Sequence, residues 1–128
     1  MTAVYLAGPS AELDRVRAAA AAIDAAGHVI TCRWFDVIEH DREGRPTDAG
    51  STRATLVRAW RANTAGIRHA EIVVALALAG GGLSPGTREE VAYAEGVGEV
   101  LVRVIGDPYP SLVGCATCCV ETVEEALR

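Results

Sequence analysis

The stretch EIVVALALAGGGLSPGTREEVAYA, residues 71–94, decides the fold of this chain. An unbroken apolar run comes first, then a glycine-rich loop, and then a segment that opens with polar residues. A continuous apolar run of this length is typical of a strand that helices cover on both faces of a parallel sheet. The stretch therefore predicts a strand over 71–78, a loop, and a helix over 87–96.

The same alternation of strand and helix extends through the rest of the chain. Further strands are predicted at 3–7, 28–34 and 99–105, with a short fifth one within 111–119. Further helices are predicted from Ser10, as N-cap, to a stop at Gly27, over 51–69, and over 120–128. At 128 residues the chain is expected to form one domain, 1–128. The predicted fold class is α/β, a single doubly wound, flavodoxin- or Rossmann-like parallel sheet of four to five strands with flanking helices.

The composition of the chain argues against several classes of partner and reaction. The net charge is −5 and the pI is about 5.1, which disfavours a nucleic-acid partner because such partners require a basic face. All 12 basic residues are arginines, so Schiff-base and P-loop lysine chemistry are excluded. No membrane span and no signal peptide are expected, and the expected location is the cytoplasm.

The cysteines leave one alternative open. Cys115, Cys118 and Cys119 form a CATCC cluster, whereas Cys32 stands alone. A C-x-x-C pair suits metal binding or redox chemistry, but a zinc site needs about four ligands and the histidines are scattered. Reduced thiols, with no metal and no cofactor, are therefore the expectation, and a metal or redox role for the cluster is the alternative.

In doubly wound sheets, ligands bind beyond the carboxyl ends of the strands. Loops at 8–10, 34–36 and 79–87 should meet there, and two of them lead into helix N-termini that suit a phosphate. Glu89 and Glu90 lie near the start of the helix after the third strand. Thr87 and Glu90 also form a T-x-x-E pattern, so helix capping competes with catalysis as the role of Glu90.

Four motifs resemble the nucleoside 2-deoxyribosyltransferase superfamily in order and spacing. They are VYLAGP, AAGHVITCRW, GIRHAEIVVAL and SPGTREEVAYA, and together they span about residues 3–105. The last resembles the signature G-T-x-x-E-x-G-Y-A of that superfamily, with Ala92 in place of the second glycine. Glu71 likewise stands where the superfamily usually has Asp.

The resemblance implies N-glycosidic bond chemistry on a nucleoside or nucleoside 5′-monophosphate. It makes Glu90 the nucleophile that forms a glycosyl-enzyme ester, which a second base or water then resolves. Asn63 stands where the superfamily usually has an Asp that assists the base, and an amide cannot donate a proton as an acid. Ser84 stands where transferases of free nucleosides often have Asp, which favours a monophosphate substrate.

The predicted site therefore has two parts. The catalytic residues are Glu90 and Asn63, and the substrate-binding residues are Tyr5, Gly8, Ser10, Trp34, Ser84, Gly86 and Thr87. Several of these positions have a plainer alternative: Tyr5 and Trp34 as core, Ser84 as a turn former, and Asn63 as a partner of a neighbouring carbonyl. The alternative function is a non-catalytic nucleotide-binding module. Since a site on so small a sheet would be shallow, and the superfamily closes its pockets with neighbouring subunits, a homodimer or higher homo-oligomer is also expected.

Overall fold

The computed structural model describes residues 1–37, 53–109 and 118–128, and these contain one parallel sheet. Its strands lie in the order β2-β1-β3-β4-β5, and every neighbouring pair is parallel. They are β1 (Ala3–Ala7), β2 (Val29–Ile30), β3 (Ile72–Leu76), β4 (Leu101–Ile105) and β5 (Cys118–Val120). The predicted doubly wound α/β fold is confirmed, with five strands.

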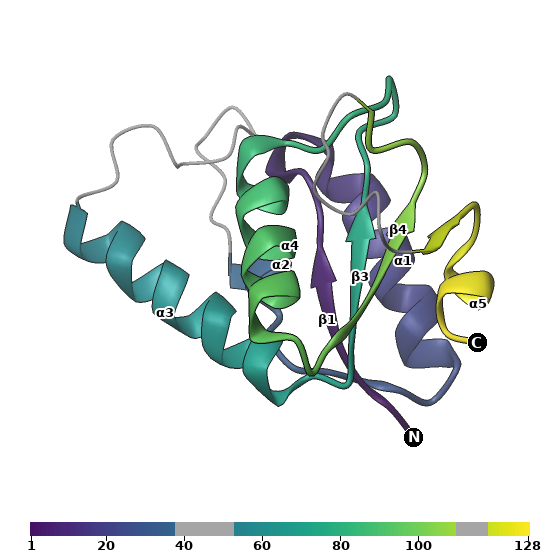
Figure 1. The fold of residues 1–128 in the computed structure, drawn as a ribbon, viewed down its shortest axis with the longest axis horizontal. Coiled ribbons are helices and arrows are strands. Elements are labelled where there is room, and N and C mark those ends of the chain that lie inside the picture. Colours follow the sequence, from purple (N-terminus) through teal and green to yellow (C-terminus); the bar gives the residue numbers. More distant parts are fainter. Residues whose placement is uncertain (38–52, 110–117) are drawn as a thin grey trace.

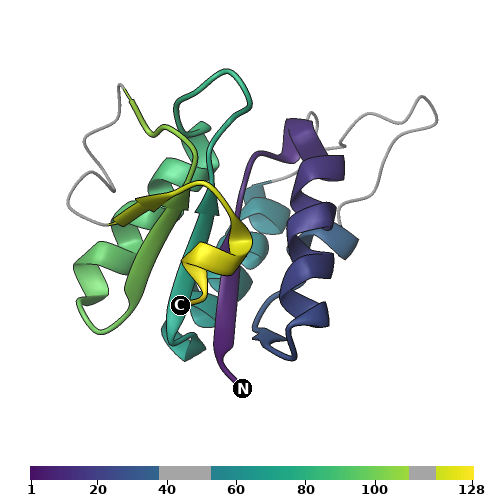
Figure 2. The ribbon, with the colours of Figure 1, turned by 90° about the vertical axis from the view of Figure 1, so that its right-hand side faces the viewer.

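Helices cover both faces of this sheet (Figures 1 and 2). On one face lie α1 (Leu13–Ala25), preceded by the 3-10 turn η1 (Ser10–Glu12), and α5 (Val123–Ala126). On the other face lie α3 (Arg53–His69) and α4 (Pro85–Val97). The short α2 (Trp34–Val37) follows β2. None of the helices in the described part of the chain is long and apolar enough to cross a membrane.

Alternation along β1 divides the core into two clusters. Val4 and Leu6 face α1, whereas Tyr5 and Ala7 face α3 and α4. All five residues of β3 are buried, as expected of a central strand with helices on both sides. Tyr5 is thus the polar residue of a strand that is otherwise apolar, and it lies on the α3–α4 side.

Of the two predicted ends of helix α1, the structure confirms the C-terminal one only. The prediction that Ser10 is its N-cap was wrong, because Ser10 opens the 3-10 turn and the residue before that turn is Pro9, which has no capping side chain. The stop at Gly27 is confirmed. Gly27 has φ of 84°, its N–H bonds to Asp24 O, and the N–H of His28 bonds to Ile23 O. These two bonds form a Schellman motif, which requires the left-handed conformation that glycine adopts without strain.

The second strand is much shorter than the predicted 28–34. The N–H of Thr31 bonds to Val4 O, so the next bond of this ladder would use Leu6 O. That carbonyl instead accepts the indole N–H of Trp34 at 2.7 Å. The side chain of Trp34 thereby takes the place of a backbone donor, and the chain turns into α2 where a longer strand was predicted.

The strand order reverses between β1 and β3, which pair from Val4↔Ile72 to Ala7↔Ala75. From β1 the chain continues to α1 on one face, and from β3 it continues to α4 on the other. Such a switch point is where doubly wound sheets bind ligands. The loops that leave β1 and β3 are therefore the first place to look for a site.

Candidate active site

Glu90 and Tyr5 form a buried pair near this switch point. The phenol O–H of Tyr5 donates to Oε2 of Glu90, and the two residues are 0% and 8% exposed. Among the described residues Glu90 has no cationic partner. Burial raises the pKa of Glu90 to about 7; the bond from Tyr5 lowers it and the charge of Glu89 raises it. The pKa of Tyr5 is raised too, first by burial and then by Glu90, so the phenol remains a donor.

Glu90 does not cap its helix. The prediction that α4 starts at Thr87 was wrong, because the helix starts at Pro85 and its N-cap is Ser84. Glu90 therefore lies in the second turn, beyond the range over which a helix dipole stabilises an acid. Capping does not explain a buried carboxylate there. Glu89, its exposed neighbour, is likewise outside the first turn.

Ser84, Gly86 and Thr87 lie together at the N-terminus of α4. The hydroxyl of Ser84 accepts the N–H of Thr87 at 3.4 Å and lies 2.7 Å from the hydroxyl of Thr87, which is 1% exposed. Pro85 has no N–H, and the N–H of Gly86 has no partner among the described residues. A Cβ on Gly86 would meet nothing within 4 Å. Gly86 therefore combines an unpartnered backbone donor with an exposed position at the start of α4.

A second set of residues, from just after β2 and from α3, lies close to the ring of Tyr5. The thiol of Cys32, after β2, donates to Oδ1 of Asn63 on α3 at 3.5 Å. One turn later on α3, a Cβ on Gly66 would lie 2.8 Å from Cβ of Cys32 and 3.0 Å from Cδ2 of Tyr5. Only a glycine at position 66 lets α3 approach so closely. The structure therefore brings Asn63, Cys32, Tyr5 and Glu90 together, and sequence reasoning had not placed Cys32 in this group.

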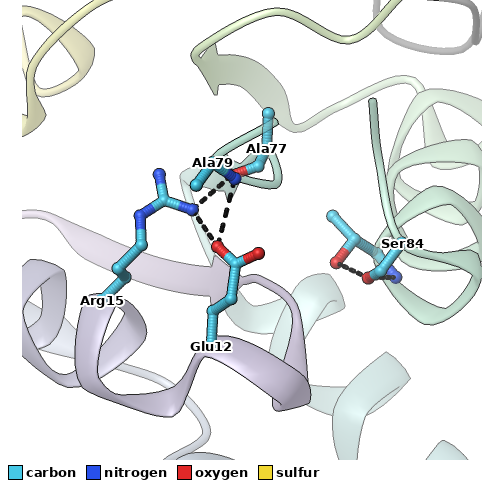
Figure 3. A network of polar contacts seen from close by, with 6 residues as sticks. Glu12, Arg15, Ala77, Ala79 and Ser84 are labelled. Carbon is cyan, nitrogen blue, oxygen red and sulfur yellow. Dashed lines mark hydrogen bonds and ion pairs between the residues drawn. The ribbon is translucent and has the colours of Figure 1, made fainter. Parts of the chain in front are cut away.

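Ion pairing holds the loop after β3 against the start of α1 (Figure 3). Oε1 of Glu12 pairs with Nη1 of Arg15 and accepts the N–H of Ala79 at 3.1 Å. The same Nη1 donates to Ala77 O at 3.0 Å. The sequence analysis missed this network, although an acid and an arginine three residues apart at a helix start are a recognisable signal. It sets the course of the chain between β3 and Ser84.

The other predicted site residues have structural explanations. Gly8 is buried, and a Cβ there would lie 2.9 Å from Cγ2 of Val16, so this glycine allows α1 to pack on the sheet. Trp34 is partly buried and contacts both core clusters. Ser10 is partly exposed in the 3-10 turn. Their contacts with a ligand stay predictions.

Two predictions, a role for the CATCC cluster and a function of the loop at 36–50, involve residues that the structure does not describe. Cys115 and most of the loop at 36–50 lie outside the described residues, so the hypotheses that rest on them stay hypotheses. The described residues contain no group of three or more His, Cys, Asp or Glu that could hold a metal ion.

The first half of α3 differs from the second. Leu56, Val57 and Trp60 are 52%, 37% and 39% exposed, whereas Ile67 is fully buried. In the sequence, the spacing of Leu56, Trp60, Asn63 and Ile67 predicts one inward-facing stripe, but in the structure only the end of this stripe, at Ile67, is fully buried. In Figure 1 the first half of α3 extends away from the sheet. The ring of Trp60 nevertheless makes an edge-to-face contact with the ring of Tyr93 on α4.

Comparison with known proteins rests on structure. No protein-family model matches the sequence, and comparison with curated proteins gives no significant match. A 2-deoxyribosyltransferase from Bacillus psychrosaccharolyticus is similar, with a TM-score of 0.63 and 15% identity over 96% of this chain and 88% of that one. A CMP N-glycosidase from Clostridium botulinum has a TM-score of 0.57 and 16% identity over 98% and 94% of the two chains.

A conserved protein from Enterococcus faecalis V583 is also similar, with a TM-score of 0.59 and 19% identity. The match covers 82% of this chain but only 63% of the Enterococcus protein. At these identities a likeness establishes the fold and nothing finer. The chain therefore has the fold of the 2-deoxyribosyltransferase and CMP N-glycosidase structures.

Proposed function

We propose that the protein cleaves or transfers the N-glycosidic bond of a nucleoside or nucleoside 5′-monophosphate, with Glu90 as the nucleophile. The observation that carries this proposal is the burial of Glu90 at the switch point with a neutral phenol as its partner. A buried carboxylate without a cation is costly to keep ionised, and such groups are concentrated at functional sites. Two structures with this fold are named for a deoxyribosyl transfer and an N-glycosidase reaction.

The proposed chemistry has two steps. An oxygen of ionised Glu90 forms a bond to C1′ of the sugar, while the bond from C1′ to the base nitrogen breaks and its electron pair leaves with the base. Water or a second base then attacks C1′, and the carboxylate leaves unchanged. The Tyr5 hydroxyl holds Glu90 in place, and the pKa of about 7 means that reactivity grows as the pH rises through neutrality.

Phosphate recognition is assigned to the N-terminus of α4. Ser84 supplies a hydroxyl, which the buried hydroxyl of Thr87 orients, and Gly86 supplies an unpartnered N–H, at a helix end whose dipole favours an anion. An acid at position 84 would repel a phosphate, whereas a serine accepts one. This favours 5′-monophosphates over free nucleosides as substrates.

The test is release of free base from a panel of ribo- and deoxyribonucleosides and their 5′-monophosphates. Glu90→Gln should lose activity by a factor on the order of 10³ or more on any active substrate, as expected when a covalent nucleophile is removed. Glu89→Gln is the matched control, because it changes the exposed neighbour and should retain most of the rate. Full activity in Glu90→Gln would defeat the assignment.

The second candidate is a nucleotide-binding module without turnover. Asn63 favours this candidate, because its amide accepts a hydrogen bond from the thiol of Cys32 and has no acidic proton to give to a departing base. Such a protein would bind a nucleotide measurably by calorimetry and release no base over hours. Gain of base release in Asn63→Asp would then indicate an intact scaffold with an idle site.

We also propose a homo-oligomer, a dimer at least, that is built on α3 and α4. Leu56, Val57 and Trp60 form an exposed apolar surface on α3, and a neighbouring subunit would cover it and help exclude water from the site. Sedimentation at micromolar concentration should give a species larger than 13.4 kDa. Leu56→Arg should dissociate it, whereas Leu101→Arg, at a similarly exposed leucine on β4, should not.

A further inference from the structure

The contacts of Cys32 determine which end of the Asn63 amide is available. The single thiol proton is donated to Oδ1 of Asn63. The sulfur accepts a hydrogen bond from the backbone of Trp34. Burial raises the pKa of the Cys32 thiol. The hydrogen bond from the backbone of Trp34 lowers this pKa and the charge of Glu90 raises it, but the effect of burial is the largest, so the thiol keeps its proton. Cys32 is therefore a donor towards Asn63.

The thiol fixes which way the Asn63 amide faces: Oδ1 is turned towards Cys32, and the NH2 group is turned away from it. This nitrogen has no hydrogen-bond partner among the residues that the structure describes, and Asn63 is only partly buried. An amide NH2 donates two hydrogen bonds and has no proton that it can release as an acid. An incoming molecule would thus meet a neutral donor at position 63.

A chain of contacts connects this donor to the proposed nucleophile. Asn63 and Gly66 are one turn apart on α3 and share the face that contacts Cys32. A Cβ on Gly66 would also touch Tyr5, whose hydroxyl donates to Glu90.

We propose that Cys32 is a positioning residue, which orients Asn63 so that its NH2 group hydrogen-bonds the departing base, and that the base leaves as an anion. This inference rests on the proposed function. As the Glu90 oxygen bonds to C1′, the electron pair of the glycosidic bond stays on the base nitrogen, and Asn63 stabilises the negative charge without transferring a proton. The anion takes its proton from water after departure.

The substrate class follows from this arrangement. Bases that form stable anions are suited to such a site, and a pyrimidine with a carbonyl next to its glycosidic nitrogen places an acceptor within reach of the amide. Uracil- and thymine-type bases should therefore be released faster than adenine, whose departure is helped by protonation of the ring.

The first test uses 2′-deoxyuridine 5′-monophosphates with methyl, hydrogen, bromo and fluoro substituents at C5. Rates of the wild-type protein should rise steeply with the acidity of the leaving base. Asn63→Ala removes the proposed donor and should lower the rates most for the least acidic bases, so its dependence should be steeper than that of the wild-type protein. A flat dependence in the wild-type protein would overturn the anionic departure.

The second test isolates Cys32. Cys32→Ala should lower kcat about tenfold with little change in KM, as expected for one lost hydrogen bond, and Cys32→Ser should restore most of the rate. In an Asn63→Ala background, Cys32→Ala should cause no further loss. An equal loss with and without Asn63, or no rescue by serine, would mean that Cys32 only fills space.

A third measurement does not depend on turnover. Asn63→Asp puts a negative charge beside the thiol, which should raise its pKa by about one unit and slow alkylation of Cys32 by iodoacetamide about tenfold at pH 8. Asn63→Ser is the neutral control, and mass spectrometry follows the Cys32 peptide. An unchanged rate would overturn the contact between Cys32 and Asn63. A protein that releases no base would overturn the proposed function and the leaving-group claim together, whereas this measurement would still decide the contact.

Discussion

Two carboxylates at the same edge of the sheet are treated in opposite ways. Glu12 is partly exposed, pairs with Arg15 and accepts the N–H of Ala79. Glu90 is 8% exposed and has the phenol of Tyr5 as its hydrogen-bond partner. The first arrangement supplies a cation and stabilises a loop. The second withholds a cation, which costs stability and leaves a carboxylate poised to react.

The largest effect should come from removing the buried charge. For Glu90 the folded pKa of about 7 exceeds the usual 4.5, so the unfolded chain ionises first as the pH rises and the folded state binds more protons between these values. Stability should therefore fall from pH 5 to pH 8, by roughly 2–3 kcal/mol, and level off above pH 7. Glu90→Gln should abolish this fall.

Urea denaturation of both proteins at pH 5 and pH 8 measures the difference. As the pH rises, the free energy of unfolding of the Gln variant should increase relative to that of the wild-type protein, even though the variant has lost its activity. A wild-type protein whose pH dependence equals that of Glu90→Gln would show that Glu90 is ionised in the folded state at all these pH values.

The buried group can also be disturbed by size instead of charge. Gly66→Ala would place a Cβ 2.8 Å from Cys32 Cβ and should destabilise the protein by about 1–3 kcal/mol. Gly96→Ala is the matched control in α4, because a Cβ there would meet nothing within 4 Å. It should be neutral or stabilise by up to about 1 kcal/mol. Thermal melting compares the two, and equal melting temperatures would contradict the close approach of α3.

Tyr5→Phe tests whether the phenol sets the pKa of Glu90. The bond from Tyr5 lowers the pKa of Glu90, so its loss should raise that pKa by about one unit, the equivalent of about 1.4 kcal/mol. The rising limb of the pH–rate profile should shift to higher pH by the same amount, with about a fivefold loss of activity at pH 7. A profile that loses height without moving would mean that the phenol acts on the substrate instead.

The smallest effect should come from the exposed network. Glu12→Gln removes the partner of Arg15, and the pair is partly solvated, so about 1 kcal/mol or less of stability should be lost. Asp14→Asn, at an exposed acid of the same helix, is the control and should be neutral. Chemical denaturation is the measurement. A loss as large as the pH-dependent change at Glu90 would show that the two carboxylates do not differ as described.

Much of the fold was predictable because periodicity and helix stop signals act locally. The unbroken run at 71–78 indicated a central strand, and Gly27 marked the end of α1 because its backbone is left-handed there. The register of the G-T-x-x-E motif singled out Glu90 over Glu89, and the structure buries the first and exposes the second. The sequence likewise predicts Tyr5, Asn63 and Glu90 as site residues, and the structure brings them into one group through Cys32 and Gly66.

Contacts between distant segments were decided by the tertiary structure. The indole of Trp34 takes the carbonyl that would have extended β2, and α4 starts at Pro85, two residues before its predicted start, with Ser84 as its N-cap. The contact of Cys32 with Asn63 depends on the closeness of α3 at Gly66, which no local pattern encodes. Composition and periodicity determine which segments are buried, because burial acts on each residue. Which polar groups then become partners depends on distances across the fold, since a hydrogen bond forms only within a few tenths of an ångström of its preferred length.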